Sequence, residues 1–168
     1  MDKNNLPLDI VGSTELIEVA GIKNIPAKID TGADTSAIWA SDIKMGKDGE
    51  LSFVLFDKDS PLYTGEQLRS TDYKAKIVRS SHGDEQIRYR VTLPITICNK
   101  SFTTSFTLAN RSRNIFPVLI GRHTLEGNFL VNVSKNAVER PRAFEVHHLN
   151  EELKEDPYAF HQKYLKND

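Results

Sequence analysis

The sequence contains only one cysteine, Cys98, in 168 residues. A single thiol cannot close a disulfide within the chain, and it excludes a zinc site built from several cysteines. No run of about 18 apolar residues occurs, so no transmembrane helix is predicted. The first residues also lack the apolar segment of a secretory signal. Together with the lone thiol, these absences predict a cytoplasmic protein with no membrane partner.

An excess of charge of either sign is also missing. The chain carries 22 Lys and Arg against 23 Asp and Glu, a net charge of -1. This balance gives no long-range field that would attract nucleic acid, and we find no aromatic platform for stacking bases. We therefore expect no nucleic-acid partner. The length suits a single domain with a hydrophobic core, so we predict one domain over residues 1–168.

Two signatures of cofactor chemistry are absent from the sequence. There is no Gly-rich phosphate-binding loop ending in Lys-Ser or Lys-Thr, so we expect no bound ATP. No zinc-protease spacing of the type His-Glu-x-x-His occurs either, and we expect no metal ligands and no cofactor. A metal-dependent hydrolase is kept as a third, weaker alternative, which retained activity in a chelator would exclude. The histidines concerned are His82, His123, His147, His148 and His161.

Short apolar or alternating segments, separated by turn residues, dominate the chain. About eight such strands predict an all-β barrel or sandwich with small helices. Residues 73–79 and 86–91 predict one hairpin, and residues 92–98 and 101–108 predict a second. Polar and turn residues at 57–72 predict a loop or an insertion. The other predicted strands are 15–20, 25–29, 51–56, 116–121 and 129–133, with 37–40 as a strand or a helical turn and 122–126 as one helical turn.

The sequence is organised around Asp30, which follows the apolar run 25–29. Gly32 allows a sharp turn after it, and the hydroxyls of Thr31 and Ser36 can bond neighbouring backbone groups. Such a turn would hold the Asp30 carboxylate at a strand end, where a carboxylate can act as a general base on water. An Asp-x-Gly sequence is equally typical of an ordinary turn, so the three residues alone leave both interpretations open.

A second segment, Val118-Leu119-Ile120-Gly121-Arg122, favours the catalytic interpretation over the ordinary turn. Asp30-Thr31-Gly32-Ala33-Asp34 together with that segment resembles the retropepsin-like aspartic peptidases. The bacterial RimB-like branch, whose members are catalogued as ATP-dependent zinc proteases, is the better match, and Arg111-Ser112-Arg113 fits it too. The resemblance covers residues 10–135 and implies a retropepsin-like closed β-barrel with small helices. Residues 136–168 then form a C-terminal tail, in which Asp156-Pro157 predicts the start of a short helix.

The resemblance also assigns roles to individual residues. It implies that Asp30 is the catalytic aspartate, that Thr31 bonds its twofold mate, and that Asp34 and Arg122 form a supporting ion pair. Substrate contacts are implied for the hairpin tip, where retropepsins carry a flap, and for one arginine of the Arg-Ser-Arg motif. The supporting residues are Thr31, Gly32, Ala33, Asp34, Thr35, Gly121 and Arg122, and the substrate-binding residues are Ser81, His82, Gly83 and Arg113.

The single Asp-Thr-Gly sequence has a consequence for assembly. Aspartic peptidases use two carboxylates that share one proton, and this chain supplies one. We therefore predict a homodimer in which Asp30 of each subunit meets its mate on a twofold axis. The predicted activity is that of an aspartic endopeptidase acting on a peptide or protein. The alternative is a non-catalytic module of the same fold that binds a peptide or a partner.

Lys and Arg residues cluster around the predicted flap and cleft. Such a cluster favours an acidic peptide, although a solvated hairpin face is an equally good interpretation. The resemblance adds a more specific implication, because RimB-like proteins are linked to ATP-grasp ligases that add glutamates to a protein tail. It implies a glutamate-tailed substrate and such a ligase as a partner, which would also account for any dependence on ATP.

Overall fold

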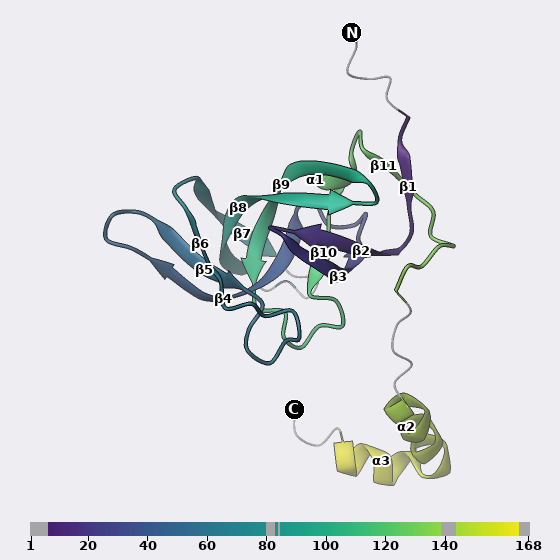
Figure 1. The fold of residues 1–168 in the computed structure, drawn as a ribbon. Helices are drawn as coiled ribbons and strands as arrows, with labels where there is room; N and C mark the ends of the chain where they lie inside the picture. Colours follow the sequence, from purple (N-terminus) through teal and green to yellow (C-terminus); the bar gives the residue numbers. More distant parts are fainter. Residues whose placement is uncertain (1–6, 80–82, 84, 139–143, 165–168) are drawn as a thin grey trace. The chain divides into compact units, whose positions relative to one another are not determined.

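The computed structural model describes residues 7–79, 83, 85–138 and 144–164. The chain divides into two compact units, Met1–Val138 and Glu139–Asp168. The first unit contains every strand and the short helix α1, and the second contains the helices α2 and α3 (Figure 1). Each unit is described by itself below.

The first unit is a closed barrel of six strands, as the sequence predicts. The strands follow the order β10-β3-β2-β8-β9-β4, and β4 pairs with β10 again to close the ring (Figure 1). Closure leaves none of these six strands as a free edge. Their bounds are β2 Thr14–Val19, β3 Ile22–Ile29, β4 Ser36–Met45, β8 Glu85–Ile97, β9 Lys100–Ala109 and β10 Val118–Ile120.

Apolar residues alternate with polar ones along the barrel strands, and the apolar side chains fill the barrel interior. In β8, for example, Val91, Leu93, Ile95 and Ile97 are buried, while Thr92 between them is exposed. Side chains along a strand point alternately to its two faces, so this pattern directs one face inward. The buried set continues through Ile25, Ile38, Phe106 and Val118 from the other barrel strands. These side chains form one hydrophobic core beneath the ends of β3 and β10.

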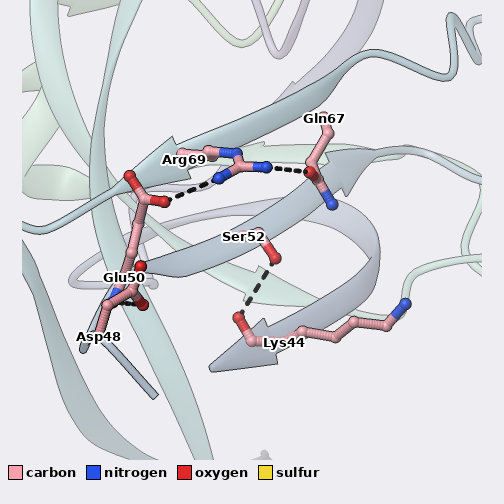
Figure 2. Close-up of polar contacts among 6 residues, drawn as sticks. All are labelled: Lys44, Asp48, Glu50, Ser52, Gln67 and Arg69. Atoms are coloured by element: carbon pink, nitrogen blue, oxygen red, sulfur yellow. Dashed lines mark hydrogen bonds and ion pairs between the residues drawn. The ribbon is translucent and has the colours of Figure 1, made fainter. Parts of the chain in front are cut away.

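Outside the barrel, β4 continues the sheet through β5 (Leu51–Leu55) to β6 (Gln67–Ser70). The prediction of a loop or an insertion over 57–72 was therefore wrong for residues 67–70, which form β6. β6 alternates between exposed and half-buried residues, so it carries almost no apolar signal of a strand. Figure 2 shows Arg69 of β6 bonding Glu50 at 3.0 Å and Gln67 at 3.1 Å. It also shows Ser52 Oγ donating to the carbonyl of Lys44, between β5 and β4.

Three further strands complete the unit. β7 (Tyr73–Arg79) pairs with the first part of β8, which confirms the hairpin predicted at 73–91. The predicted segments 86–91 and 92–98 belong to one long strand, β8. The burial pattern changes along β8, but its pairing with neighbouring strands is not interrupted. β1 (Asp9–Val11), which was not predicted, pairs in parallel with β11 (Phe129–Val131). Residues 37–40 are part of β4, which selects the strand over the helical turn.

The second unit consists of two helices, α2 (Phe144–Glu155) and α3 (Pro157–Tyr164). The predicted start of α3 is confirmed, since the backbone N–H of Ala159 donates to Asp156 Oδ1 at 2.9 Å. α2 was not predicted. Across the described residues, no helix is both long and apolar enough to cross a membrane.

Candidate active site

The Asp30 turn begins where β3 ends, at Ile29. β10 runs parallel to β3 with Ile120 level with Ile29, so the two strands end at the same edge. The backbone N–H of Asp30 donates to the Ile120 carbonyl at 2.9 Å. The N–H of Ala33 then donates to the Asp30 carbonyl at 3.2 Å, which closes the turn. Two motifs about ninety residues apart in the sequence are thus joined by backbone bonds.

The Asp30 side chain is half-buried at this edge. Its Oδ1 accepts a hydrogen bond from the backbone N–H of Gly32 at 3.0 Å. A Cβ atom at Gly32 would lie 3.3 Å from that same Oδ1, and the backbone of Gly32 is outside the left-handed region. Glycine therefore allows the close approach of the carboxylate, which would have to shift slightly for a larger residue, whereas the turn itself imposes no unusual φ angle.

Gly121 is the residue on which the Asp30 turn rests. A Cβ atom there would lie 2.7 Å from the carbonyl carbon of Thr35 and 2.9 Å from the carbonyl oxygens of Ala33 and Thr35. The next two residues hold the turn from the same side, since Arg122 N–H donates to Ala33 O at 2.7 Å and His123 N–H donates to Asp34 O at 3.1 Å. The α1 helix (Arg122–Leu125) starts here, as the sequence predicts.

A chain of buried hydroxyl groups connects the turn to the barrel. Ser36 Oγ and Thr124 Oγ1 are 2.7 Å apart, and Thr124 Oγ1 is 2.9 Å from Thr104 Oγ1. Ser36 Oγ also accepts the backbone N–H of Gly121 at 3.0 Å. Ser36 and Thr124 are each only 1% exposed, so these bonds satisfy groups that water cannot reach. The sequence indicated that Ser36 bonds backbone, but nothing in it identified Thr104 or Thr124.

The predicted partners Asp34 and Arg122 do form an ion pair between Oδ1 and Nη2. Both side chains are well exposed, at 65% and 60%, so the pair contributes little to stability. Ala33 and Thr35 are half-buried in the turn, and Thr31 is exposed. The exposed position leaves the Thr31 hydroxyl accessible to another molecule.

The predicted substrate-binding residues have different outcomes. Ser81 and His82 lie outside the described residues, and Gly83 is exposed near the end of the β7–β8 hairpin. Arg113 is exposed on the loop between β9 and β10. On that same loop Arg111 is half-buried, and its Nε donates to the Phe116 carbonyl at 3.1 Å. The Arg-Ser-Arg motif drew attention to this loop without showing which arginine lies inward.

Arg111 lies within electrostatic reach of Asp30. Desolvation lowers the pKa of Arg111, the positive charge of Arg88 lowers it further, and the Asp30 carboxylate opposes both effects. Desolvation also lowers the pKa of Arg88, on β8. Both guanidinium groups stay protonated near neutral pH, because arginine starts from a very high value. Arg111 is therefore a cation near the candidate catalytic carboxylate, and Arg88 is a second cation near Arg111.

A polar cavity of about 410 Å³ adjoins the turn. Thr35 and His123 line it from the Asp30 side, and Arg90 lines it from β8. The remaining lining comes from hydroxyl side chains of β8 and β9, namely Thr92, Thr103, Thr104 and Ser105. Within the described part of the chain, no three His, Cys, Asp or Glu side chains are grouped as a metal site would require.

A closed barrel with an Asp-Thr-Gly turn braced by an apolar-apolar-Gly segment defines a retropepsin-like protein. Residues 10–142 match the family described as "RimB-like: Retropepsin-like aspartic endopeptidase RimB". The match covers most of the sequence, and the chain therefore belongs to the RimB-like family of retropepsin-like aspartic endopeptidases. The resemblance inferred from the sequence is confirmed.

The curated relatives that match this chain are longer proteins. A probable alpha-L-glutamate ligase of Desulfotalea psychrophila is 28% identical over 128 residues, covering 73% of this chain and 28% of the relative. One from Shewanella pealeana is 29% identical over 132 residues, covering 76% of this chain and 29% of the relative. The chain thus spans less than a third of the length of these curated relatives.

A solved structure also matches. The crystal structure of a Legionella pneumophila protein of unknown function superposes with a TM-score of 0.60 at 26% sequence identity. The match covers 76% of this chain and 95% of the Legionella chain. The Legionella protein is therefore almost entirely of this fold.

Proposed function

We propose that this protein is an aspartic endopeptidase that acts as a homodimer and hydrolyses peptide bonds with water. One observation carries the proposal: Asp30 is fixed at the open end of β3 by β10, with a half-buried carboxylate. The sequence supplies one such aspartate per chain, so a second subunit is needed to provide its mate. The exposed Thr31 is the residue we assign to the contact between the two turns.

The chemistry follows from two Asp30 carboxyl groups that share one proton. The ionised group removes a proton from water, and the water oxygen attacks the carbonyl carbon of the scissile bond. The protonated group gives its proton to the carbonyl oxygen, which leaves a tetrahedral diol. The carboxyl group that took the water proton then protonates the amide nitrogen, while the other carboxylate takes a proton from one hydroxyl of the diol. The C–N bond breaks, an amine and a carboxylic acid leave, and the pair again holds one proton. Gly32 supports this cycle by donating its N–H to Asp30 Oδ1.

The shared proton predicts a bell-shaped dependence of cleavage rate on pH. At low pH both carboxyl groups are protonated and the general base is lost, whereas at high pH both are ionised and the general acid is lost. The two limbs report apparent pKa values of the pair. The measurement is kcat/KM for one peptide from pH 3 to pH 9. Activity that rises without a fall through pH 9 would contradict the shared proton.

We further propose that the substrate is a protein carrying a glutamate tail and that the chain works beside an ATP-grasp ligase in the cytoplasm. The glutamate-ligase names of the curated relatives support this link, because those longer chains include a region similar to this one. The test compares a glutamate-extended protein with the same protein lacking the extension. We expect cleavage of the extended form only, detected by mass spectrometry. Equal cleavage of both forms would contradict the proposal that the enzyme acts on a glutamate tail.

A further inference from the structure

One face of the β7–β8 hairpin carries four cations. In the strand register Lys74 lies directly opposite Arg90, and Lys76 lies directly opposite Arg88. Directly opposed residues project from the same face with Cβ atoms about 4.5–5.5 Å apart, and like charges in such positions are destabilising. The opposite face holds the partly buried Tyr73 and Tyr89, which pack against the barrel core. The hairpin thus separates an apolar inner face from a cationic one.

No carboxylate of the described residues forms an ion pair with a cation on this face. Across the described residues, none of the four cations forms an ion pair with a carboxylate, and neither does Arg111. Arg88 donates to the neutral Gln86 Oε1, at 2.9 and 3.1 Å, and Arg111 donates to a carbonyl. By contrast Arg79, at the end of β7, pairs with Glu85. Among the described residues, four cations on one face of the hairpin and one on the adjoining loop therefore have no carboxylate partner.

Two observations relate this face to the Asp30 turn. Arg88 and Asp30 are each close enough to Arg111 to act on it electrostatically. Arg90, two residues along β8, lines the polar cavity whose other side is formed by Thr35 and His123. Arg88, Arg90 and Arg111 are each half-buried. Arg111 relates this face to Asp30, and Arg90 relates it to the cavity beside the Asp30 turn.

We propose that Arg88, Arg90 and Arg111 form a binding track for carboxylate side chains on alternate residues of an extended peptide that crosses Asp30. The inference rests on the proposed function, which places a peptide there. Side chains two residues apart on an extended chain share a face and are about 6.6–6.8 Å apart, the same spacing as Arg88 and Arg90 along β8. Guanidinium groups bind carboxylates through paired hydrogen bonds, so arginine suits this task better than lysine.

An acidic peptide fits this track better than a nucleic acid does. The whole chain has a net charge of -1, which offers no general attraction for a phosphate backbone. The tyrosines of the hairpin pack edge-to-face against each other at 5.8 Å between ring centroids, so they do not form an open stacking platform. The test still includes single-stranded RNA, as the competing ligand.

The test measures binding to the full chain carrying Asp30→Asn, so that peptide is not consumed. The probe is a fluorescent capped peptide with Glu at alternate positions, compared with its Gln counterpart. We expect Kd for the Glu peptide to be lower by at least about tenfold, as loss of charged hydrogen bonds implies. Arg88→Gln or Arg111→Gln should each remove about five- to tenfold of that affinity. The matched control is Arg69→Gln, which removes the same charge from an exposed site on β6 and should change Kd by less than about twofold.

Other outcomes would overturn the inference. Equal affinity for the Glu and Gln peptides would do so, and so would equal losses in Arg111→Gln and Arg69→Gln. A peptide with the same number of Glu residues placed consecutively should bind more weakly, and equal binding would remove the alternating register. Tighter binding of oligouridylate at the same arginines would assign the track to RNA. Glu-selective binding without any cleavage by the wild type would contradict the proposed peptidase activity alone. Cleavage without Glu preference would leave the peptidase activity standing and would contradict this inference and the proposed glutamate tail.

Discussion

Replacing Asp30 with asparagine is expected to lower kcat/KM for peptide cleavage by about 10²–10⁴-fold, the range typical of lost general acid–base catalysis. Asparagine cannot ionise, so neither the base that activates water nor the shared proton is available. The side-chain oxygen of asparagine can still accept the Gly32 N–H that Asp30 Oδ1 accepts at 3.0 Å. We therefore expect the free energy of unfolding to change by less than about 0.5 kcal/mol, as for a surface substitution.

The matched control is Asp34→Asn, four residues further along the same turn. Asp34 is 65% exposed and pairs with Arg122, so its loss should cost only about 0–1 kcal/mol of stability. Cleavage should stay within about tenfold of the wild type, because Asp34 contributes no proton to the reaction. If Asp30→Asn cleaves as fast as the wild type, Asp30 is not catalytic. If Asp30→Asn loses turnover yet still binds peptide, the enzyme is favoured over the non-catalytic binding module.

Replacing Gly121 with alanine is expected to have the largest effect on stability. The new methyl group would lie 2.7–2.9 Å from three backbone atoms of Ala33 and Thr35, and backbone cannot move aside as a flexible side chain can. Such overpacking costs about 1–3 kcal/mol, and more where the neighbours are fixed. Thermal or urea unfolding measures the loss, and cleavage should fall with it because the Asp30 turn is displaced.

The comparison variant is Gly32→Ala. A methyl group there would meet only Asp30 Oδ1, at 3.3 Å, and Gly32 is exposed. The free energy of unfolding should therefore fall by less than about 1 kcal/mol, while the carboxylate shifts and cleavage falls by about tenfold or more. We thus expect Gly121→Ala to lower mainly the free energy of unfolding and Gly32→Ala to lower mainly the cleavage rate. Similar stabilities for Gly121→Ala and Gly32→Ala would contradict the role given to Gly121.

The sequence predicted an all-β fold because its strands carry strong local signals, and the resemblance to the retropepsin-like family selected the closed barrel over a sandwich. Alternating apolar residues such as Leu93 and Ile95 identify an inward face, and Gly121 identifies the brace for the turn once it is paired with Asp30. β6 escaped prediction because an edge strand with polar residues on both faces resembles a loop. β1 escaped because three residues make too short a pattern, and its partner β11 is more than a hundred residues away.

The candidate site was predicted where it depends on one contiguous motif and missed where it depends on packing. Asp30, Gly32 and Asp34 belong to one turn, so their relation can be read along the chain. Thr124 bonds Ser36, and Thr104 bonds Thr124, through the fold alone, and no local pattern marks such hydroxyl groups. Arg111 and Arg113 have the same side chain two residues apart, and only the Phe116 carbonyl distinguishes the inward one.

Mixing wild-type subunits with Asp30→Asn subunits tests the central claim most directly, because a shared site depends on both copies. The two proteins are mixed at fixed total concentration, allowed to exchange subunits, and tested for cleavage. With equal amounts, random pairing leaves about one quarter of the dimers with two intact aspartates, so activity should fall to about one quarter of the wild type. Activity should follow the square of the wild-type fraction. A linear dependence, with half the activity at equal amounts, would mean that each chain has a complete site, and it would contradict the homodimeric aspartic peptidase.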